Sequence, residues 1–171
     1  MTISPNANAQ QGIDTLTITP DNTQIQFNAK HFGVLNVSGT FKSFSGWLII
    51  QNDIIISAQL KLKTNSIFTD NHSRDKSLKA KEFLNAKGYP HINLGFTDND
   101  HPAIIQAQLK IKRVSNIIPI TYRLDPEIQG TQSIQANCKI SRTLYSLDLG
   151  RMDDLVSDKI DVVVSITLIT K

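Results

Sequence analysis

The sequence predicts an all-β fold, in which an antiparallel sheet of about eight strands closes into a barrel or a sandwich. Apolar and polar residues alternate in most of the chain, and this period is typical of strands. One apolar and one polar face on each strand indicate antiparallel sheet with one side in water. A single such sheet must close or fold over to bury its apolar side.

The alternating segments follow one another with short breaks. In the clearest of them, Ile54, Ala58 and Leu62 share one face and Lys61 and Lys63 share the other. Turn-forming residues, such as TPDN at 19–22 and DPEIQG at 125–130, separate the segments, so sequence neighbours are expected to pair. The predicted strands lie at 24–29, 35–41, 54–63, 92–96, 105–112, 118–122, 134–140 and 160–168.

One charged stretch interrupts the strands and predicts a short helix at about 71–87. Asn71 or Ser73 can cap its N-terminus, and Leu78 with Phe83 forms part of an apolar stripe. Gly88 is expected to end it. We interpret the segment as a lid or bridge that closes one side or end of the barrel.

Composition narrows the function classes. The chain has 171 residues and a formal charge of +3 without a basic run, so one domain and no nucleic-acid partner are expected. Cys138 is the sole cysteine, which excludes an intrachain disulfide and a cysteine-based zinc site within one chain. Apolar runs of four or five residues, such as WLII, are too short to span a membrane.

The first residues, MTISPNANAQQGID, carry no basic and no apolar region of a secretory signal, so the compartment stays open. Residues 1–12 are predicted to be a flexible tail, and residues 13–171 a single barrel domain.

Two blocks, KHFGVLNVSGTFKSFSG (30–46) and SIFTDNHSRDKSLKAKEFLNAKGYPHINL (66–94), resemble the YceI-like polyisoprenoid-binding family. A third, KISRTLYSLDLG with VSDKIDVVVSITL, is similar to its closing pattern through Arg142 and Asp158. Ser77 and Asn85 depart from the family pattern, as does RVSNII at 113–118. The matching positions are His31, Gly33, Gly39, Phe41, Gly46, Asn71, Arg74, Asp75, Leu78, Phe83, Tyr89 and Pro90.

The resemblance implies a bacterial, lipocalin-like barrel with a long apolar tunnel that stores or transports an isoprenoid quinone or polyprenyl phosphate. It also implies a possible homodimer, and a role in stress response. No cofactor other than the lipid is expected. The residues predicted to line the tunnel are Phe27, Phe32, Leu35, Phe41, Trp47, Ile67, Phe68, Leu78, Phe83, Leu84, Ile92, Leu94 and Phe96. Those predicted at the rim, near a head group, are His31, Arg74, Asp75 and Arg142.

Size patterning supports a hollow interior, although the aromatic residues taken alone fit an ordinary core better. Small inward residues would leave a channel between the larger ones. These residues are Ala29, Gly39, Ala58, Ala107 and Ala136. A barrel packed solid with side chains, as in a structural protein without ligand, is the competing interpretation.

Catalytic and metal sites are weakly indicated. Asp70, His72, Asp75 and His91 are metal-ligand types, but no HExxH motif supports them, and no metal is expected. No GxSxG elbow is present, and Cys138 is interpreted as a small hydrophobe, so no catalytic residue is expected. The alternative is an enzyme acting on a small apolar substrate through His31, His72 or nearby carboxylates. Arg74 and Asp75 could either grip a head group or fix the helix.

Overall fold

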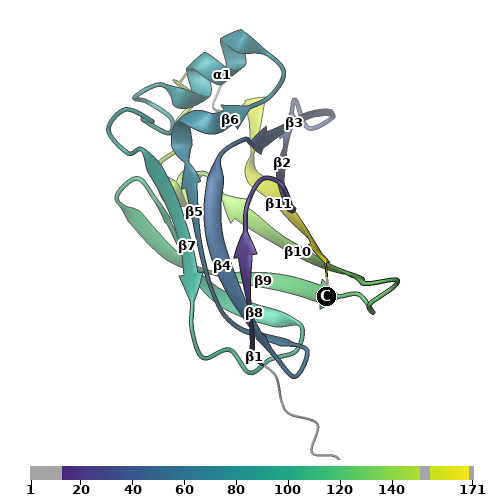
Figure 1. Cartoon of the computed structure of the whole chain (residues 1–171). Helices are drawn as coiled ribbons and strands as arrows, with labels where there is room; N and C mark the ends of the chain where they lie inside the picture. The colour runs from purple at the N-terminus through teal and green to yellow at the C-terminus, as the bar shows by residue number, and fades with distance from the viewer. Residues whose placement is uncertain (1–12, 151–154, 170–171) are drawn as a thin grey trace, which may run out of the picture.

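The strands pair almost entirely with antiparallel neighbours in one sheet (Figure 1). The computed structural model describes residues 13–150 and 155–169, so the tail predicted at 1–12 lies outside the described residues. The strands are β1 (Ile13–Ile18), β2 (Thr23–His31), β3 (Leu35–Phe41), β4 (Phe44–Gln51), β5 (Ile54–Lys63), β6 (Ile67–Phe68), β7 (His91–Phe96), β8 (Ile104–Ile111), β9 (Val114–Leu124), β10 (Thr131–Ser141) and β11 (Val156–Ile169). The helical segments with both bounds inside the described residues are α1 (His72–Lys79) and the 3₁₀ turns η1 (Thr64–Ser66) and η2 (Thr143–Tyr145).

The all-β fold is confirmed, but the predicted number of about eight strands is too low, since the sheet has eleven strands within the described residues. Strand β4 was missed because its run Trp47-Leu48-Ile49-Ile50 is continuously apolar and hides the alternation. Strand β6 has only two residues, which is too short for any periodicity. Strand β1 pairs with β4 from Ile13 to Ile18 and went unnoticed with it.

The connections force the sheet to curl. The strand order is β1-β4-β5-β7-β8-β9-β10-β11-β2-β3-β6, so β1 and β6 are its two ends. Only Lys42 and Ser43 join β3, near one end, to β4, near the other. A connection that short brings the two ends of the sheet together. Figure 1 shows the wrapped sheet, with α1 at one end of it. The buried apolar side chains lie inside the wrapped sheet.

The helical segment is shorter than predicted. Asn71 caps α1, and its side chain accepts a hydrogen bond from the backbone N–H of Arg74 at 2.9 Å. The helix ends at Lys79, not near residue 87, because Ala80 takes an extended backbone conformation. The following turns let Phe83, Leu84 and Ala86 all be buried. A continuing helix would have turned these side chains in different directions.

Gly39 makes room for an aromatic ring of the facing strand. It pairs with Phe27, and a Cβ at Gly39 would lie 2.2 Å from the ring of Phe27 and 2.8 Å from Thr69. We expect Gly39→Ala to lower the free energy of unfolding by about 1–3 kcal/mol, because the ring must move. Urea unfolding measures this, with Gly95→Ala as the matched control, since a Cβ there meets its nearest neighbour at 3.5 Å. Equal losses in both variants would contradict the packing argument.

Candidate functional site

The wrapped sheet encloses a cavity of about 670 Å³. This volume falls within the range of small-molecule sites, about 300–1,000 Å³. Its lining is mostly aliphatic and aromatic and comes from β1 to β11 and the lid turns after α1. Three of the predicted small residues, Ala29, Ala58 and Ala136, lie on it. Gly39 does not, because the ring of Phe27 fills its place.

Most residues predicted to line the tunnel border this cavity. They are Phe27, Phe41, Ile67, Leu78, Phe83, Leu84, Ile92, Leu94 and Phe96.

Four predicted residues lie elsewhere. Trp47 lies on the outer face of β4, since its neighbour Leu48 points inward. Phe68 likewise faces out beside Ile67 and is 40% exposed. Phe32 and Leu35 lie at the β2–β3 turn, each 58% exposed. We therefore do not place these four among the cavity contacts.

The aliphatic half of the lining was not among the predicted cavity residues, because the prediction gave weight to aromatic residues. The alternation in the second half of the chain held the signal, because every second residue there points to one face. The missed residues include Ile105, Leu109, Ile111, Ile118, Ile120, Ile134, Ile140, Ile160, Val162, Val164 and Ile166.

Polar side chains border the cavity where α1 and the end of β2 meet it. Asn71, Ser73 and Arg74 contribute from α1 and its cap, and His31 from β2. The Nε2 atom of His31 is buried and has no hydrogen-bond partner among the described residues. Its ring packs against Phe32, with centroids 4.3 Å apart. A buried imidazole nitrogen without a partner is costly unless something supplies a hydrogen bond.

Arg74 and Asp75 both bind Thr69, the residue after β6. The Oδ1 atom of Asp75 accepts hydrogen bonds from the backbone N–H of Thr69 at 2.8 Å and from its hydroxyl at 2.6 Å. Arg74 donates to the Thr69 hydroxyl at 2.8 Å and to its carbonyl at 2.7 Å. Asp75 is buried and does not border the cavity. These contacts attach α1 to the residue after β6. Of the two roles considered for Arg74 and Asp75, they support fixing the helix over gripping a head group.

Arg142 is buried, with 3% exposure, and holds the segment after β10 against β11. Its guanidinium donates to the carbonyl oxygens of Leu147, Val156 and Ser157 at 3.1, 3.0 and 3.3 Å. It also borders the cavity, so it contributes positive charge near the polar side chains.

Asp158 anchors the same segment. Its carboxylate accepts hydrogen bonds from the Thr143 hydroxyl at 2.6 Å, the Thr143 backbone N–H at 3.0 Å and the Ser141 hydroxyl at 2.7 Å. These bonds, led by that of the Thr143 hydroxyl, hold the pKa of Asp158 well below its usual range. Because its pKa is lowered in the folded state, Asp158 stabilises the fold at pH values above the pKa of an unfolded aspartate, about 3.9.

We therefore expect Asp158→Asn to be less stable than the wild type at neutral pH. The difference should shrink as pH falls below about 3.9, because the wild-type protein must then protonate Asp158 as it unfolds. Urea unfolding of both proteins from pH 7 downward measures this. A difference that stays constant with pH would contradict the role of the charge.

The candidate metal ligands and the cysteine named in the sequence can each be located in the structure. Across residues 13–150 and 155–169, no group of three or more histidine, cysteine, aspartate or glutamate side chains could hold a metal ion. Asp70 and His72 are exposed at the start of α1. Burial, with a smaller effect of the Asp161 carboxylate, raises the pKa of Cys138 to about 11, so its thiol is a poor nucleophile at neutral pH.

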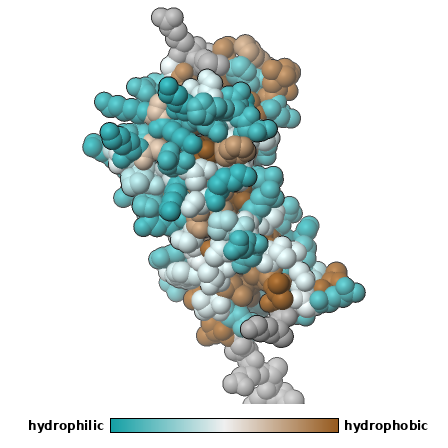
Figure 2. All heavy atoms as spheres, turned by 45° about the horizontal axis from the view of Figure 1, so that its top comes forward, coloured by the Kyte–Doolittle hydropathy of each residue, from teal (hydrophilic) through white to brown (hydrophobic). Residues whose placement is uncertain are grey.

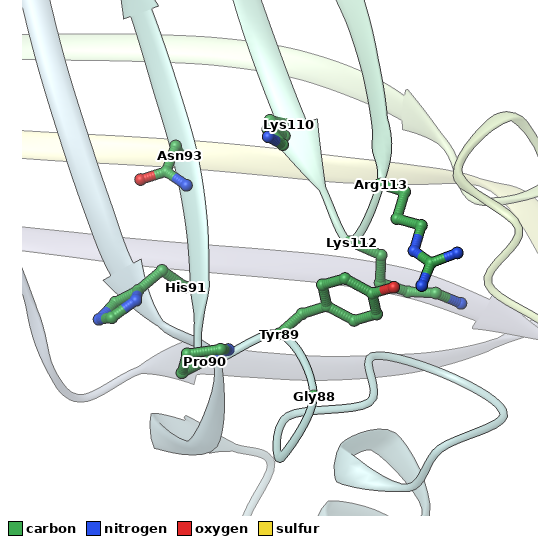
Figure 3. A pocket seen from close by; sticks show the side chains of 8 residues that line it. All are labelled: Gly88, Tyr89, Pro90, His91, Asn93, Lys110, Lys112 and Arg113. Atoms are coloured by element: carbon green, nitrogen blue, oxygen red, sulfur yellow. The ribbon is translucent and has the colours of Figure 1, made fainter.

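A second pocket, of about 420 Å³, lies outside the barrel (Figure 3). It is lined by Gly88, Tyr89, Pro90, His91, Asn93, Lys110, Lys112 and Arg113. Lys112 is engaged in the fold, since its ammonium group donates to the carbonyl oxygens of Phe83 and Ser146 at 2.9 and 2.8 Å. The basic lining of this second pocket is unsuited to an apolar chain.

The chain forms an antiparallel barrel around an apolar cavity, and polar side chains occupy one part of the lining. These features place it in the class of β-barrel proteins that can bind small apolar ligands. The family of the chain can be stated as well. The chain belongs to the YceI-like domain family, whose model matches residues 16–168. No helix within the described residues is long and apolar enough to cross a bilayer.

Individual relatives agree with this assignment. A UPF0312 protein of Enterobacter sp. (strain 638) is 25% identical over 154 residues, 83% of this chain and 78% of the relative. A UPF0312 protein of Pseudomonas aeruginosa (strain LESB58) is 28% identical over 152 residues, with the same coverage of 83% and 78%.

Solved structures share the fold. BcnA of Burkholderia cenocepacia superposes with a TM-score of 0.73 at 17% identity, covering 92% of this chain and 99% of that one. A polyisoprenoid binding domain from Saccharophagus degradans gives 0.71 at 14% identity, covering 94% and 100%. The YceI protein of Campylobacter jejuni gives 0.66 at 20% identity, covering 100% and 99%.

Proposed function

We propose that the protein binds an apolar chain lipid of the isoprenoid type in its barrel cavity, for storage or transport, without a catalytic step. The apolar cavity of about 670 Å³ is the observation that carries the proposal. Burying each CH₂ group stabilises the complex by about 0.8 kcal/mol, so a chain of several isoprene units can be bound without specific hydrogen bonds. Family membership and the similar fold of the Saccharophagus degradans polyisoprenoid binding domain support it.

The lipid head group is proposed to lie beside His31. The buried Nε2 atom of His31 has no partner in the described part of the chain, so a hydrogen-bonding head group would satisfy it. Arg74 and Arg142 border the same cavity and would add positive charge. Asp75 is proposed to hold the lid and not the ligand, because Thr69 occupies its Oδ1 atom.

Lipid analysis tests the proposal directly. Organic extraction or native mass spectrometry of the purified protein should release a chain lipid, and delipidated protein should take up a prenyl quinone from detergent. Protein that is isolated empty and also fails to take up the quinone would overturn the proposal. The homodimer stays a prediction, which analytical ultracentrifugation tests.

His31→Ala provides a sharper test of the head-group position. We expect it to weaken binding of a prenyl quinone by about three- to tenfold, the value of one hydrogen bond. Binding of squalene, a headless isoprenoid hydrocarbon, should be unchanged. The two affinities are measured by titrating each ligand, dispersed in detergent, into wild-type and variant protein. An equal loss of affinity for both ligands would place the head group elsewhere.

A further inference from the structure

An exposed apolar turn joins β2 to β3, next to the polar part of the cavity lining. Phe32, Val34 and Leu35 are 58%, 79% and 58% exposed, and they follow one another within four residues. Figure 2 shows apolar side chains gathered at the upper right of its view, on the side where the β2–β3 hairpin projects in Figure 1. We call residues 32–35 the apolar tip. Contiguous exposed apolar residues commonly mark interaction sites.

The backbone conformation at Phe32, within the apolar tip, is unfavourable for a bulky side chain. Phe32 has φ +53° and Gly33 has φ +71°, and the Val34 N–H donates to the His31 carbonyl oxygen at 3.3 Å. A turn with positive φ at both central residues favours Asn-Gly there, whereas a bulky side chain in the left-handed region is strained. Folding alone would therefore favour asparagine at position 32. A strained, exposed phenylalanine indicates a role outside folding.

The apolar tip is continuous with the cavity wall. Val37 borders the cavity, and the alternation of β3 places Leu35 on the same face. Leu35 also pairs with His31, which borders the cavity. An apolar path therefore runs from the cavity lining along β3 to the exposed turn.

We propose that the apolar tip inserts into the interface of a lipid bilayer and brings the polar part of the cavity lining to the membrane, from which the chain lipid enters. This inference rests on the proposed function, because a chain lipid resides in bilayers and not in water. Exposed Lys30, at the base of the hairpin, would meet anionic head groups. A second copy of the chain is a poorer occupant, since a stable dimer buries about 800 Å² per partner, more than three side chains supply.

Vesicle co-sedimentation tests the proposal with two variants of the full chain. The vesicles contain phosphatidylethanolamine and phosphatidylglycerol in equal parts. Phe32→Asn should weaken vesicle binding at least about tenfold, since a phenylalanine no longer leaves water. Its thermal stability should be unchanged or higher, because asparagine suits the left-handed turn. Ile117→Thr is the control: Ile117 is 60% exposed on β9, outside the apolar tip, and its removal should leave vesicle binding unchanged.

Quinone uptake from detergent separates this inference from the proposed function. Wild-type and Phe32→Asn proteins should both take up a prenyl quinone from detergent, while only the wild type should take it up rapidly from vesicles. Wild-type protein that takes up the quinone from detergent but binds no vesicles would overturn the tip proposal and keep the proposed function. A dimer that Phe32→Asn dissociates, without vesicle binding, would also overturn it. Vesicle binding without any quinone uptake would overturn the proposed function.

Discussion

Replacing Ala136 with phenylalanine is expected to weaken lipid binding by more than about tenfold while the fold is retained. Ala136 borders the cavity from β10, where it pairs with Tyr122 and Val164. A ring at this position would occupy space that several CH₂ groups of the ligand need, and the loss of two such groups already exceeds tenfold. The free energy of unfolding should stay equal or rise by about 1 kcal/mol, as is usual for cavity filling.

Gln135→Phe is the matched control for this variant. Gln135 is the preceding residue of β10 and is exposed, so the same ring would lie outside the barrel. Quinone titration into both delipidated proteins, with urea unfolding alongside, makes the comparison. Ligand affinity that Ala136→Phe leaves unchanged would contradict binding in the interior, whereas equal losses in both variants would indicate a general effect of the added ring.

The fold was largely predictable because alternation reports directly on which side of a strand meets water. Strands such as β8, with pattern Ile-Ile-Gln-Ala-Gln-Leu-Lys-Ile, bury every second residue as the sequence predicts. The pattern fails where both faces are partly covered, as on β4, and where a strand is too short, as on β6. The end of α1 was not predictable from propensity, because burial of Phe83 and Leu84 in turns overrides it.

The polar residues at the cavity were harder to predict, since their partners are set by tertiary contacts. Asp75 resembled a head-group ligand by residue type, yet Thr69 occupies its Oδ1 atom. Within the described residues, the partners of Arg142 include backbone carbonyl oxygens, which any sequence supplies and no motif marks. His31 differs, because its proposed role rests on an Nε2 atom that has no partner among the described residues, and sequence patterns carry no signal for that.

Arg142→Ala is expected to lower the free energy of unfolding by about 3 kcal/mol, a large share of the stability of a small domain. The loss arises because the carbonyl oxygens of Leu147, Val156 and Ser157 lose the donors that the guanidinium supplies. Arg142→Lys should recover only part of it, since one ammonium group cannot reproduce the fork of the guanidinium. Urea unfolding of the three proteins measures both differences.

Arg123→Ala is the control that separates burial from charge. Arg123 forms an ion pair with Asp125 at 2.7 Å, but its side chain is 69% exposed, so its removal should cost less than about 1 kcal/mol. If Arg142→Ala lowered the free energy of unfolding by as little as Arg123→Ala, the bonds to the three carbonyl oxygens would contribute little to the stability of the fold. Arg142 would then be better explained as a ligand contact, and its removal should weaken quinone binding without a loss of stability.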